Sequence, residues 1–156
     1  MMKKKRKKNK KNKCAKKTGH GIISLEGSLM FSCNDALMQM GAMIGYDNFL
    51  KYQQIFNFGL KTNIDLPGET NNASTVFTKD TMGPVELATS SFGQGFNTSM
   101  IQVASAFSSV INGGYYYQPH VVKKILNAEG GTVETVNPVL VRQTISNKTS
   151  SLIRQY

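Results

Sequence analysis

Three short helical patterns between residues 24 and 58 constrain what this chain can fold into more than any other feature. The triplet Ser24-Leu25-Glu26 is typical of a helix start, with Ser24 as the N-cap. A second helix is predicted over residues 35–44 and a third over roughly residues 48–58, because apolar side chains recur there at helical spacing. Helices this short are not stable alone, so we expect them to pack together as one helical layer.

The turn Ser32-Cys33-Asn34 separates the first two of these helices. Either Ser32 or Asn34 can cap the second helix, because each side chain has an oxygen that accepts a hydrogen bond from a free backbone N–H. Gly45 is expected to end that helix. The alternative to capping is a role in chemistry, and the tripeptide alone does not decide between the two.

The second half of the chain predicts one longer helix followed by antiparallel strands. A helix capped by Thr98 or Ser99 is predicted to run through Ile111. Residues 115–127 and 132–136 alternate like two strands around a glycine-containing turn. Ser146 is expected to cap a last helix. The expected fold class is α/β of the α+β kind, a helical layer plus antiparallel strands.

The positive charge is confined to one end of the chain. The sequence has 19 Lys and Arg residues against 9 Asp and Glu residues, a net charge of +10. Eleven of the 19 cations lie in residues 1–17, so residues 18–156 carry eight cations and nine acidic residues, a net charge of −1. The basicity belongs to a tail, and no specific binding of nucleic acid is expected from the rest.

Residues 1–13 are predicted to be a disordered polybasic tail, because dense like charges repel and little apolar surface offsets the entropy of ordering. Three interpretations stay open. The tail binds nucleic acid or an anionic membrane surface, it is an ordinary solvated tail, or it is translated from an A-rich stretch upstream of a broken gene. Neither a signal peptide nor a membrane anchor is predicted, so the chain as written is expected in the cytoplasm.

Beyond the tail, four phrases occur in order: GHGIISLEGSLMFSCNDALMQMG, FGLKTNIDLPGET, SFGQGFNTSMIQVASAFSSVINGG and YYYQPHVVKKI. On these phrases, residues 14–156 resemble part of the transpeptidase domain of a class B penicillin-binding protein of the division or sporulation type. The resemblance implies a partial penicillin-binding-protein transpeptidase, or serine β-lactamase-like, fold. In that fold a central antiparallel sheet has helices on both sides.

The resemblance also implies acyl transfer in peptidoglycan synthesis. A serine attacks the penultimate D-Ala of a stem peptide, the terminal D-Ala leaves, and an amine of a second stem peptide completes the cross-link. β-Lactams acylate the same serine. Neither a cofactor nor a metal ion is implied.

Three short motifs carry this chemistry in the family: S-x-x-K, S-x-N, and K-T-G or K-S-G. Ser32 and Asn34 match S-x-N. The resemblance implies that Ser32 relays a proton to the leaving amine, and that Asn34 orients the substrate amide and the lysine of S-x-x-K. No further substrate-binding residue is assigned.

The other two motifs are missing where the family places them. No Ser is followed by a Lys three residues later, so the chain has no activated nucleophile. The string Lys17-Thr18-Gly19 precedes S-x-N, whereas the family places K-T-G well after it, and Lys61-Thr62-Asn63 is not a match. Both are expected to be surface or turn segments. We therefore expect an internal fragment, truncated at both ends and inactive alone, whose partners include the missing halves of the same domain.

The alternative is a non-catalytic binding protein. It could be a pseudo-enzyme that recognises a stem peptide or a partner protein, or a nucleic-acid binder acting through the basic tail. An upstream reading frame encoding S-x-x-K and a downstream K-T-G would favour the fragment. Intact neighbouring genes without these motifs would favour the binding protein.

The two cysteines, Cys14 and Cys33, have neither C-x-x-C nor metal-ligand spacing, so no metal site is expected. They can be two unrelated thiols. Because the family works outside the cytoplasmic membrane, where disulfides persist, the resemblance also allows a Cys14–Cys33 disulfide. Such a bridge would stabilise the fold by about 3 kcal/mol. It would make the S-x-N turn sensitive to oxidation, with a thioredoxin-like protein as reductant.

Overall fold

The computed structural model describes residues 16, 18–71 and 73–156. The predicted tail, residues 1–13, and Cys14 lie outside the described residues. In this part of the chain the elements follow in the order α1 (Leu25–Met30), α2 (Asn34–Ile44), α3 (Tyr46–Ile55), η1 (Ala73–Thr75), α4 (Pro84–Ser90), α5 (Met100–Ile111), β1 (Tyr115–Tyr117), β2 (Lys124–Leu126), β3 (Thr132–Thr135), β4 (Leu140–Gln143) and α6 (Asn147–Ile153).

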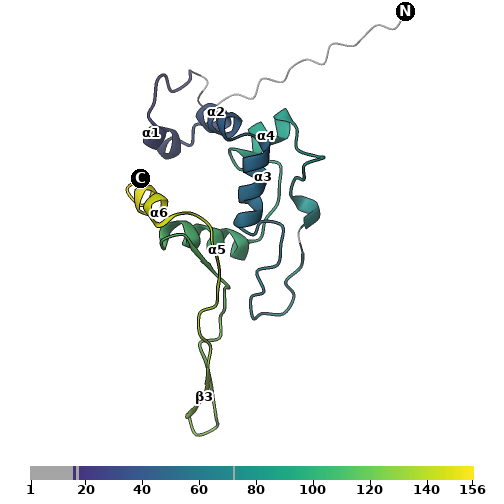
Figure 1. Cartoon of the computed structure of the whole chain (residues 1–156), viewed down its shortest axis with the longest axis vertical. Helices are drawn as coiled ribbons and strands as arrows, with labels where there is room; N and C mark the ends of the chain where they lie inside the picture. Colours follow the sequence, from purple (N-terminus) through teal and green to yellow (C-terminus); the bar gives the residue numbers. More distant parts are fainter. Residues whose placement is uncertain (1–15, 17, 72) are drawn as a thin grey trace, which may run out of the picture.

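The helices form the body of the molecule, and the β2–β3 hairpin projects away from it (Figure 1). Helix α2 packs against α3 and α4, and α5 packs against β1 and α6. Close approach of α2 and α4 depends on Gly41, since a Cβ there would lie 1.8 Å from the Ser91 hydroxyl oxygen. The predicted helical layer is therefore present.

The strands form two separate antiparallel pairs. Strand β1 pairs with β4 in the register Tyr115↔Gln143, and β2 pairs with β3 in the register Lys124↔Thr135. The predicted long strand over residues 115–127 is wrong, because it divides into β1 and β2 around Pro119, which has no N–H for a ladder bond. A mixed fold of helices and antiparallel strands is confirmed, but the described residues do not form one continuous central sheet.

Two helix starts differ from the sequence-based expectation. Cys33, and not Ser32 or Asn34, is the N-cap of α2, and no side chain caps that helix. Gly45 ends α2 as expected, but it is also the N-cap of α3, which begins at Tyr46 and not at about residue 48. Because Gly45 alone separates the two helices and glycine has no side chain, no side chain caps α3.

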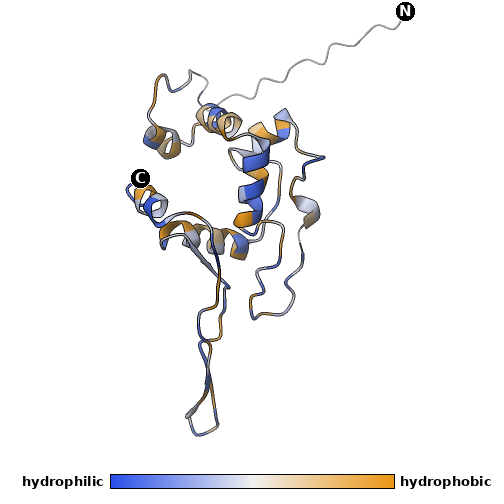
Figure 2. Cartoon of the chain, in the orientation of Figure 1, coloured by the Kyte–Doolittle hydropathy of each residue, from blue (hydrophilic) through white to orange (hydrophobic). Residues whose placement is uncertain are grey.

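The interior has few apolar residues. Only Cys33, Leu87, Ala106 and Tyr116 are buried among the hydrophobic residues of the described part, while many large hydrophobic side chains are exposed. Hydrophobic residues lie along α1, α2 and α5 (Figure 2). In folded proteins such side chains are usually covered, and large exposed apolar areas mark contact surfaces. Among the described residues, no helix is long and apolar enough to cross a membrane.

Buried polar contacts join α5 and the turn after it to Thr144, which follows β4, and to α6. The Thr144 hydroxyl donates to Ser109 Oγ and to the Gly114 carbonyl oxygen, each at 3.1 Å. The Gly113 N–H donates to Ser150 Oγ at 2.9 Å. Gly114 has φ +94°, and a Cβ there would lie 1.9 Å from the Ile145 carbonyl oxygen, so only glycine allows this close approach.

The carboxylates of Glu69 and Asp65 stabilise the long connection between α3 and η1 through hydrogen bonds. Glu69 accepts hydrogen bonds from the N–H and hydroxyl of Thr62, at 2.6 and 2.7 Å, and from the Asn63 N–H at 2.9 Å. Asp65 accepts bonds from the N–H groups of Val121 and Val122, both at 2.8 Å. The phrase Asp65-Leu66-Pro67-Gly68-Glu69 thus ties this loop to the segment before β2.

These bonds predict a pH effect. The backbone N–H groups of Val121 and Val122 lower the pKa of Asp65 below its usual value. Burial raises the pKa of Glu69, but bonds from Thr62 and Asn63 outweigh it, and that pKa is lowered too. For a lowered carboxylate pKa, stability is present above the unfolded-state pKa, about 4, and is lost as the pH falls through the folded-state pKa.

We therefore expect the amide resonances of Val121 and Val122 to shift with a midpoint below pH ~3.9, measured by NMR between pH 2 and pH 6. The Asp65→Asn variant should lack this transition at any pH. Glu129→Gln, at an exposed turn of the hairpin, is the control and should leave it unchanged. A midpoint at or above pH ~3.9 would contradict the assignment.

Candidate active site at the turn between α1 and α2

The Ser32-Cys33-Asn34 turn is a tightly bonded helix end. Phe31 is the C-cap of α1. The Ser32 N–H donates to the Leu29 carbonyl oxygen and the Cys33 N–H donates to the Ser28 carbonyl oxygen, each at 3.0 Å. This pair of bonds defines a Schellman motif, with Ser32 as the first residue beyond the cap. The backbone of the S-x-N turn is therefore fixed by α1 itself.

Ser32 occupies a position that normally favours glycine. Its φ is +45°, in the left-handed region that the Schellman motif requires. A non-glycine residue in this region is destabilised by roughly 1–2 kcal/mol. The Ser32 side chain is exposed and makes no hydrogen bond to another described residue, so no structural contact accounts for it. Backbone strain at an exposed hydroxyl supports a functional role.

Asn34 is the first residue of α2, and its side chain is half-buried. Neither Asn34 nor Ser32 caps α2, so capping does not explain this pair. Cys33 is buried between them, and its carbonyl oxygen accepts the first helical bond of α2, from the Leu37 N–H at 3.0 Å. Ser32 and Asn34 thus lie on either side of the buried Cys33, and both stay at the junction between α1 and α2.

A groove of about 600 Å³ opens beside this turn. Cys33 and Asp35 line it, together with His20 and with Met40 and Met43 of α2. Ser32 and Asn34 are not among its lining residues in the described part of the chain. The His20 ring stacks on Phe31, the C-cap of α1, with ring centroids 5.6 Å apart.

Two further polar residues, Thr62 and His120, have structural roles in the described part of the chain. The Lys61-Thr62-Asn63 string was expected at the surface or in a turn; Lys61 and Asn63 are exposed, but Thr62 is buried because its hydroxyl and N–H bond to Glu69. The His120 ring contacts the Val122 carbonyl oxygen at 2.9 Å. The described residues contain no cluster of three or more His, Cys, Asp or Glu side chains that could hold a metal ion. The Cys14–Cys33 disulfide and its reductant stay predictions, because Cys14 lies outside the described residues.

Comparison with known proteins decides the family. A family model for the penicillin binding protein transpeptidase domain matches residues 2–156. The chain belongs to this family. Stage V sporulation protein D of Bacillus subtilis is 37% identical over 143 residues, which cover 91% of this chain and 22% of that protein. Peptidoglycan D,D-transpeptidase MrdA of Acinetobacter baumannii is 32% identical over 127 residues, covering 76% of this chain and 19% of that protein.

Solved structures show the same fold. Penicillin binding protein 3 from Mycobacterium tuberculosis, complexed with aztreonam, superposes with a TM-score of 0.69 at 22% identity, over 80% of this chain and 27% of that one. Penicillin Binding Protein 2X from Streptococcus thermophilus gives a TM-score of 0.69 at 26% identity, over 81% of this chain and 18% of that one. This member of the transpeptidase family spans about one fifth of the length of the curated relatives it matches.

The sequence predicts a role for the S-x-N residues, and that role stays a prediction; the left-handed conformation of Ser32 was not predicted. A signal for it was present in the sequence. After a helix capped by Ser24 and Phe31, the next residue is most often a glycine in the left-handed conformation. A serine at this position goes against that preference.

Proposed function

We propose that this chain is the S-x-N-bearing middle part of a peptidoglycan D,D-transpeptidase domain, which cross-links the cell wall by acyl transfer and is inactive alone. The main support is Ser32, a non-glycine residue in a left-handed turn whose exposed hydroxyl has no structural partner among the described residues. The family match supplies the reaction type. On this proposal, the substrates are peptidoglycan stem peptides, and β-lactams are inhibitors.

In the proposed reaction, two groups of this chain act on the leaving D-Ala. The Ser32 hydroxyl passes a proton to the amine nitrogen as its bond to the acyl carbon breaks. The Asn34 carboxamide accepts and donates hydrogen bonds, so it can hold a substrate amide and the motif lysine together. The nucleophilic serine, that lysine and the K-T-G strand come from parts of the domain that the sequence of this chain does not contain.

The chain is also proposed to need those missing parts for stability. Four buried hydrophobic residues are a small core for the described part, and α1, α2 and α5 each present exposed apolar side chains. Strands β1 and β2 each have a single partner, which leaves edges free for further strands. We therefore expect the isolated chain to be partly molten or poorly soluble. A role in sporulation or division, on the extracytoplasmic face of the membrane, is part of the proposal.

Labelling with a fluorescent penicillin tests this function. The isolated 156-residue chain should form no covalent adduct. A chimera of Stage V sporulation protein D, in which this chain replaces the matching segment, should be acylated at the relative's own serine. The relative itself is the positive control. An adduct on the isolated chain, a sharp two-state melt of that chain, or a folded chimera that is never labelled would each contradict the proposal.

A further inference from the structure

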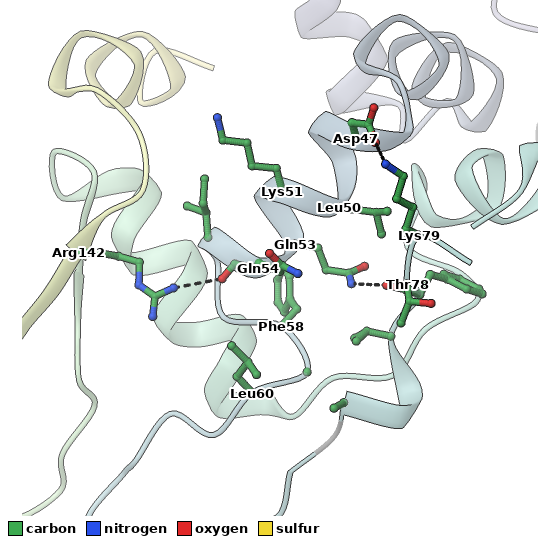
Figure 3. Close-up of a pocket in the computed structure, with 15 residues that line it drawn as sticks. Asp47, Leu50, Lys51, Gln53, Gln54, Phe58, Leu60, Thr78, Lys79 and Arg142 are labelled. Atoms are coloured by element: carbon green, nitrogen blue, oxygen red, sulfur yellow. Dashed lines mark hydrogen bonds and ion pairs between the residues drawn. The ribbon is translucent and has the colours of Figure 1, made fainter. Parts of the chain in front are cut away.

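A second cavity, of about 800 Å³, lies against α3, away from the S-x-N turn. We call it the α3 groove. Helix α3 contributes Leu50, Lys51 and Gln53 to its lining. The turn after α3, the segment 73–79 and Arg142 of β4 form the rest (Figure 3). The groove is therefore assembled from four parts of the chain.

Gln53 provides an unused hydrogen-bond acceptor in this groove. Its side chain is 6% exposed, and its Nε2 donates to the Phe77 carbonyl oxygen at 3.0 Å. The Phe77 carbonyl oxygen can accept only from an N–H, so the atom of Gln53 that faces it is Nε2. Oε1 therefore lies on the other side of the carboxamide, away from Phe77. That Oε1 atom is buried and has no hydrogen-bond partner. Buried acceptors are almost always paired, so the groove offers this oxygen to an N–H or O–H donor from outside.

The charged side chains of the groove favour an acidic ligand. Its lining has three cations, Lys51, Lys79 and Arg142, and one carboxylate, Asp47, a net charge of +2. Lys79 pairs with Asp47 at 3.8 Å, but both side chains are more than 80% exposed, and such surface pairs are weak. The exposed Lys51 makes no hydrogen bond or ion pair within the described part of the chain.

Arg142 is positioned before any ligand arrives. Its guanidinium donates to the Gln54 carbonyl oxygen at 3.2 Å and to Asn57 Oδ1 at 3.4 Å, and it lies over the Tyr116 ring at 5.8 Å. Two bonds leave further N–H groups of the guanidinium free, because arginine has five donors. In Figure 3, Lys79 lies near the N-terminal end of α3, beside Asp47, and Arg142 lies near its C-terminal end, with Gln53 between the two cations. This arrangement suits an extended ligand and not a compact one.

We propose that the α3 groove binds a short, extended acidic peptide segment of another protein. A peptide N–H donates to Gln53 Oε1, and peptide carboxylates pair with Arg142 and Lys51. Apolar peptide side chains lie on Phe58, Leu60 and Val76, which also line the groove. This site is independent of acyl transfer, since it contains neither Ser32 nor Asn34.

The test is fluorescence anisotropy on the chimera of Stage V sporulation protein D that carries the full 156-residue chain, because the isolated chain is expected to be partly molten. The probe is a fluorescein-labelled hexapeptide of alternating glutamate and leucine, and the matched control peptide has glutamine in place of glutamate. We expect saturable binding of the acidic probe, at least tenfold tighter than that of the neutral peptide. Gln53→Met should weaken binding about fivefold, the range for one neutral hydrogen bond. Lys51→Met should weaken it about threefold, and Lys124→Met, a cation on β2 outside the groove, should leave it unchanged.

The basic tail requires a separate control, because eleven cations also attract an acidic peptide. Gln53→Met does not alter the charge, so a loss of affinity in that variant does not come from the tail. Lys51→Met changes an exposed side chain and keeps the test valid if Gln53→Met unfolds. Equal affinity in the wild-type chimera, Gln53→Met and Lys51→Met would overturn the proposal. The absence of saturable binding up to 1 mM chimera, roughly the weakest specific affinity of interest, would also overturn it.

Discussion

Replacing Ser32 by alanine is expected to slow penicillin acylation of the chimera by about 10²–10⁴-fold, the usual contribution of a positioned proton-transfer group. The alanine keeps the backbone and the Cβ, so the bonds from the Ser32 N–H to Leu29 and from the Cys33 N–H to Ser28 remain. Only the hydroxyl is lost. Stopped-flow or gel-based measurement of the acylation rate checks this result, and Ser74→Ala, at an exposed position of η1, is the matched control.

Replacing Ser32 by glycine separates chemistry from structure at the same position. Acylation should fall as far as in Ser32→Ala, because the hydroxyl is again missing. The free energy of unfolding should rise, by up to about 1 kcal/mol, since glycine adopts a φ of +45° without strain. A serine retained for folding would give the opposite result. Unchanged acylation in both variants, or a less stable Ser32→Gly chimera, would remove the proposed role of Ser32.

Much of the helical layer could be predicted because its signals are local. Ser24, Ser99 and Ser146 were each expected to cap a helix, although Thr98 was an alternative to Ser99. Each one accepts a hydrogen bond from the backbone N–H of the third helical residue, Gly27, Gln102 and Thr149 respectively. An N-cap bond spans three residues, so the sequence contains both of its partners.

Elements that depend on distant partners were missed. Helix α4 has seven residues and no side-chain cap, and it packs on α2, more than 40 residues away in the sequence. Strand β4 forms only because β1 lies beside it. Neither α4 nor β4 is long enough for its hydrophobic pattern to identify it. The seven residues of α4 make about two helical turns, and the four of β4 give two residues on each face.

The candidate site also has features that the sequence predicts and features that only the structure reveals. The S-x-N residues could be proposed from the sequence because a motif consists of consecutive residues. The strain at Ser32 follows from where α1 ends, and element boundaries are the least certain part of sequence reasoning. The unpaired Oε1 atom of Gln53 could not be predicted from the sequence. Phe77, which orients the Gln53 carboxamide, is 24 residues away and lies in a loop.

The Gln102 side chain forms both local and distant hydrogen bonds. Its replacement should destabilise the fold more than any other substitution considered. Its Oε1 accepts from the Ser99 N–H at 2.9 Å and from the Thr98 hydroxyl at 2.7 Å, which completes a capping box at the start of α5. Its Nε2 donates to the carbonyl oxygens of Leu60 and Asn57, beyond the end of α3. One carboxamide, 1% exposed, therefore joins the start of α5 to the loop that follows α3.

The Gln102→Met substitution should reduce the free energy of unfolding of the chimera by roughly 3–5 kcal/mol. Methionine fills about the same volume, but it leaves the Leu60 carbonyl oxygen and the Ser99 N–H without their Gln102 partners, at about 1–3 kcal/mol each. The Ser99 hydroxyl oxygen still caps α5, since it accepts from the backbone N–H of residue 102. Urea unfolding measures the loss. Gln143→Met, at an exposed position of β4, should change stability by less than about 0.5 kcal/mol. A Gln102→Met chimera as stable as wild type would mean that these bonds do not hold α5 against the α3 loop.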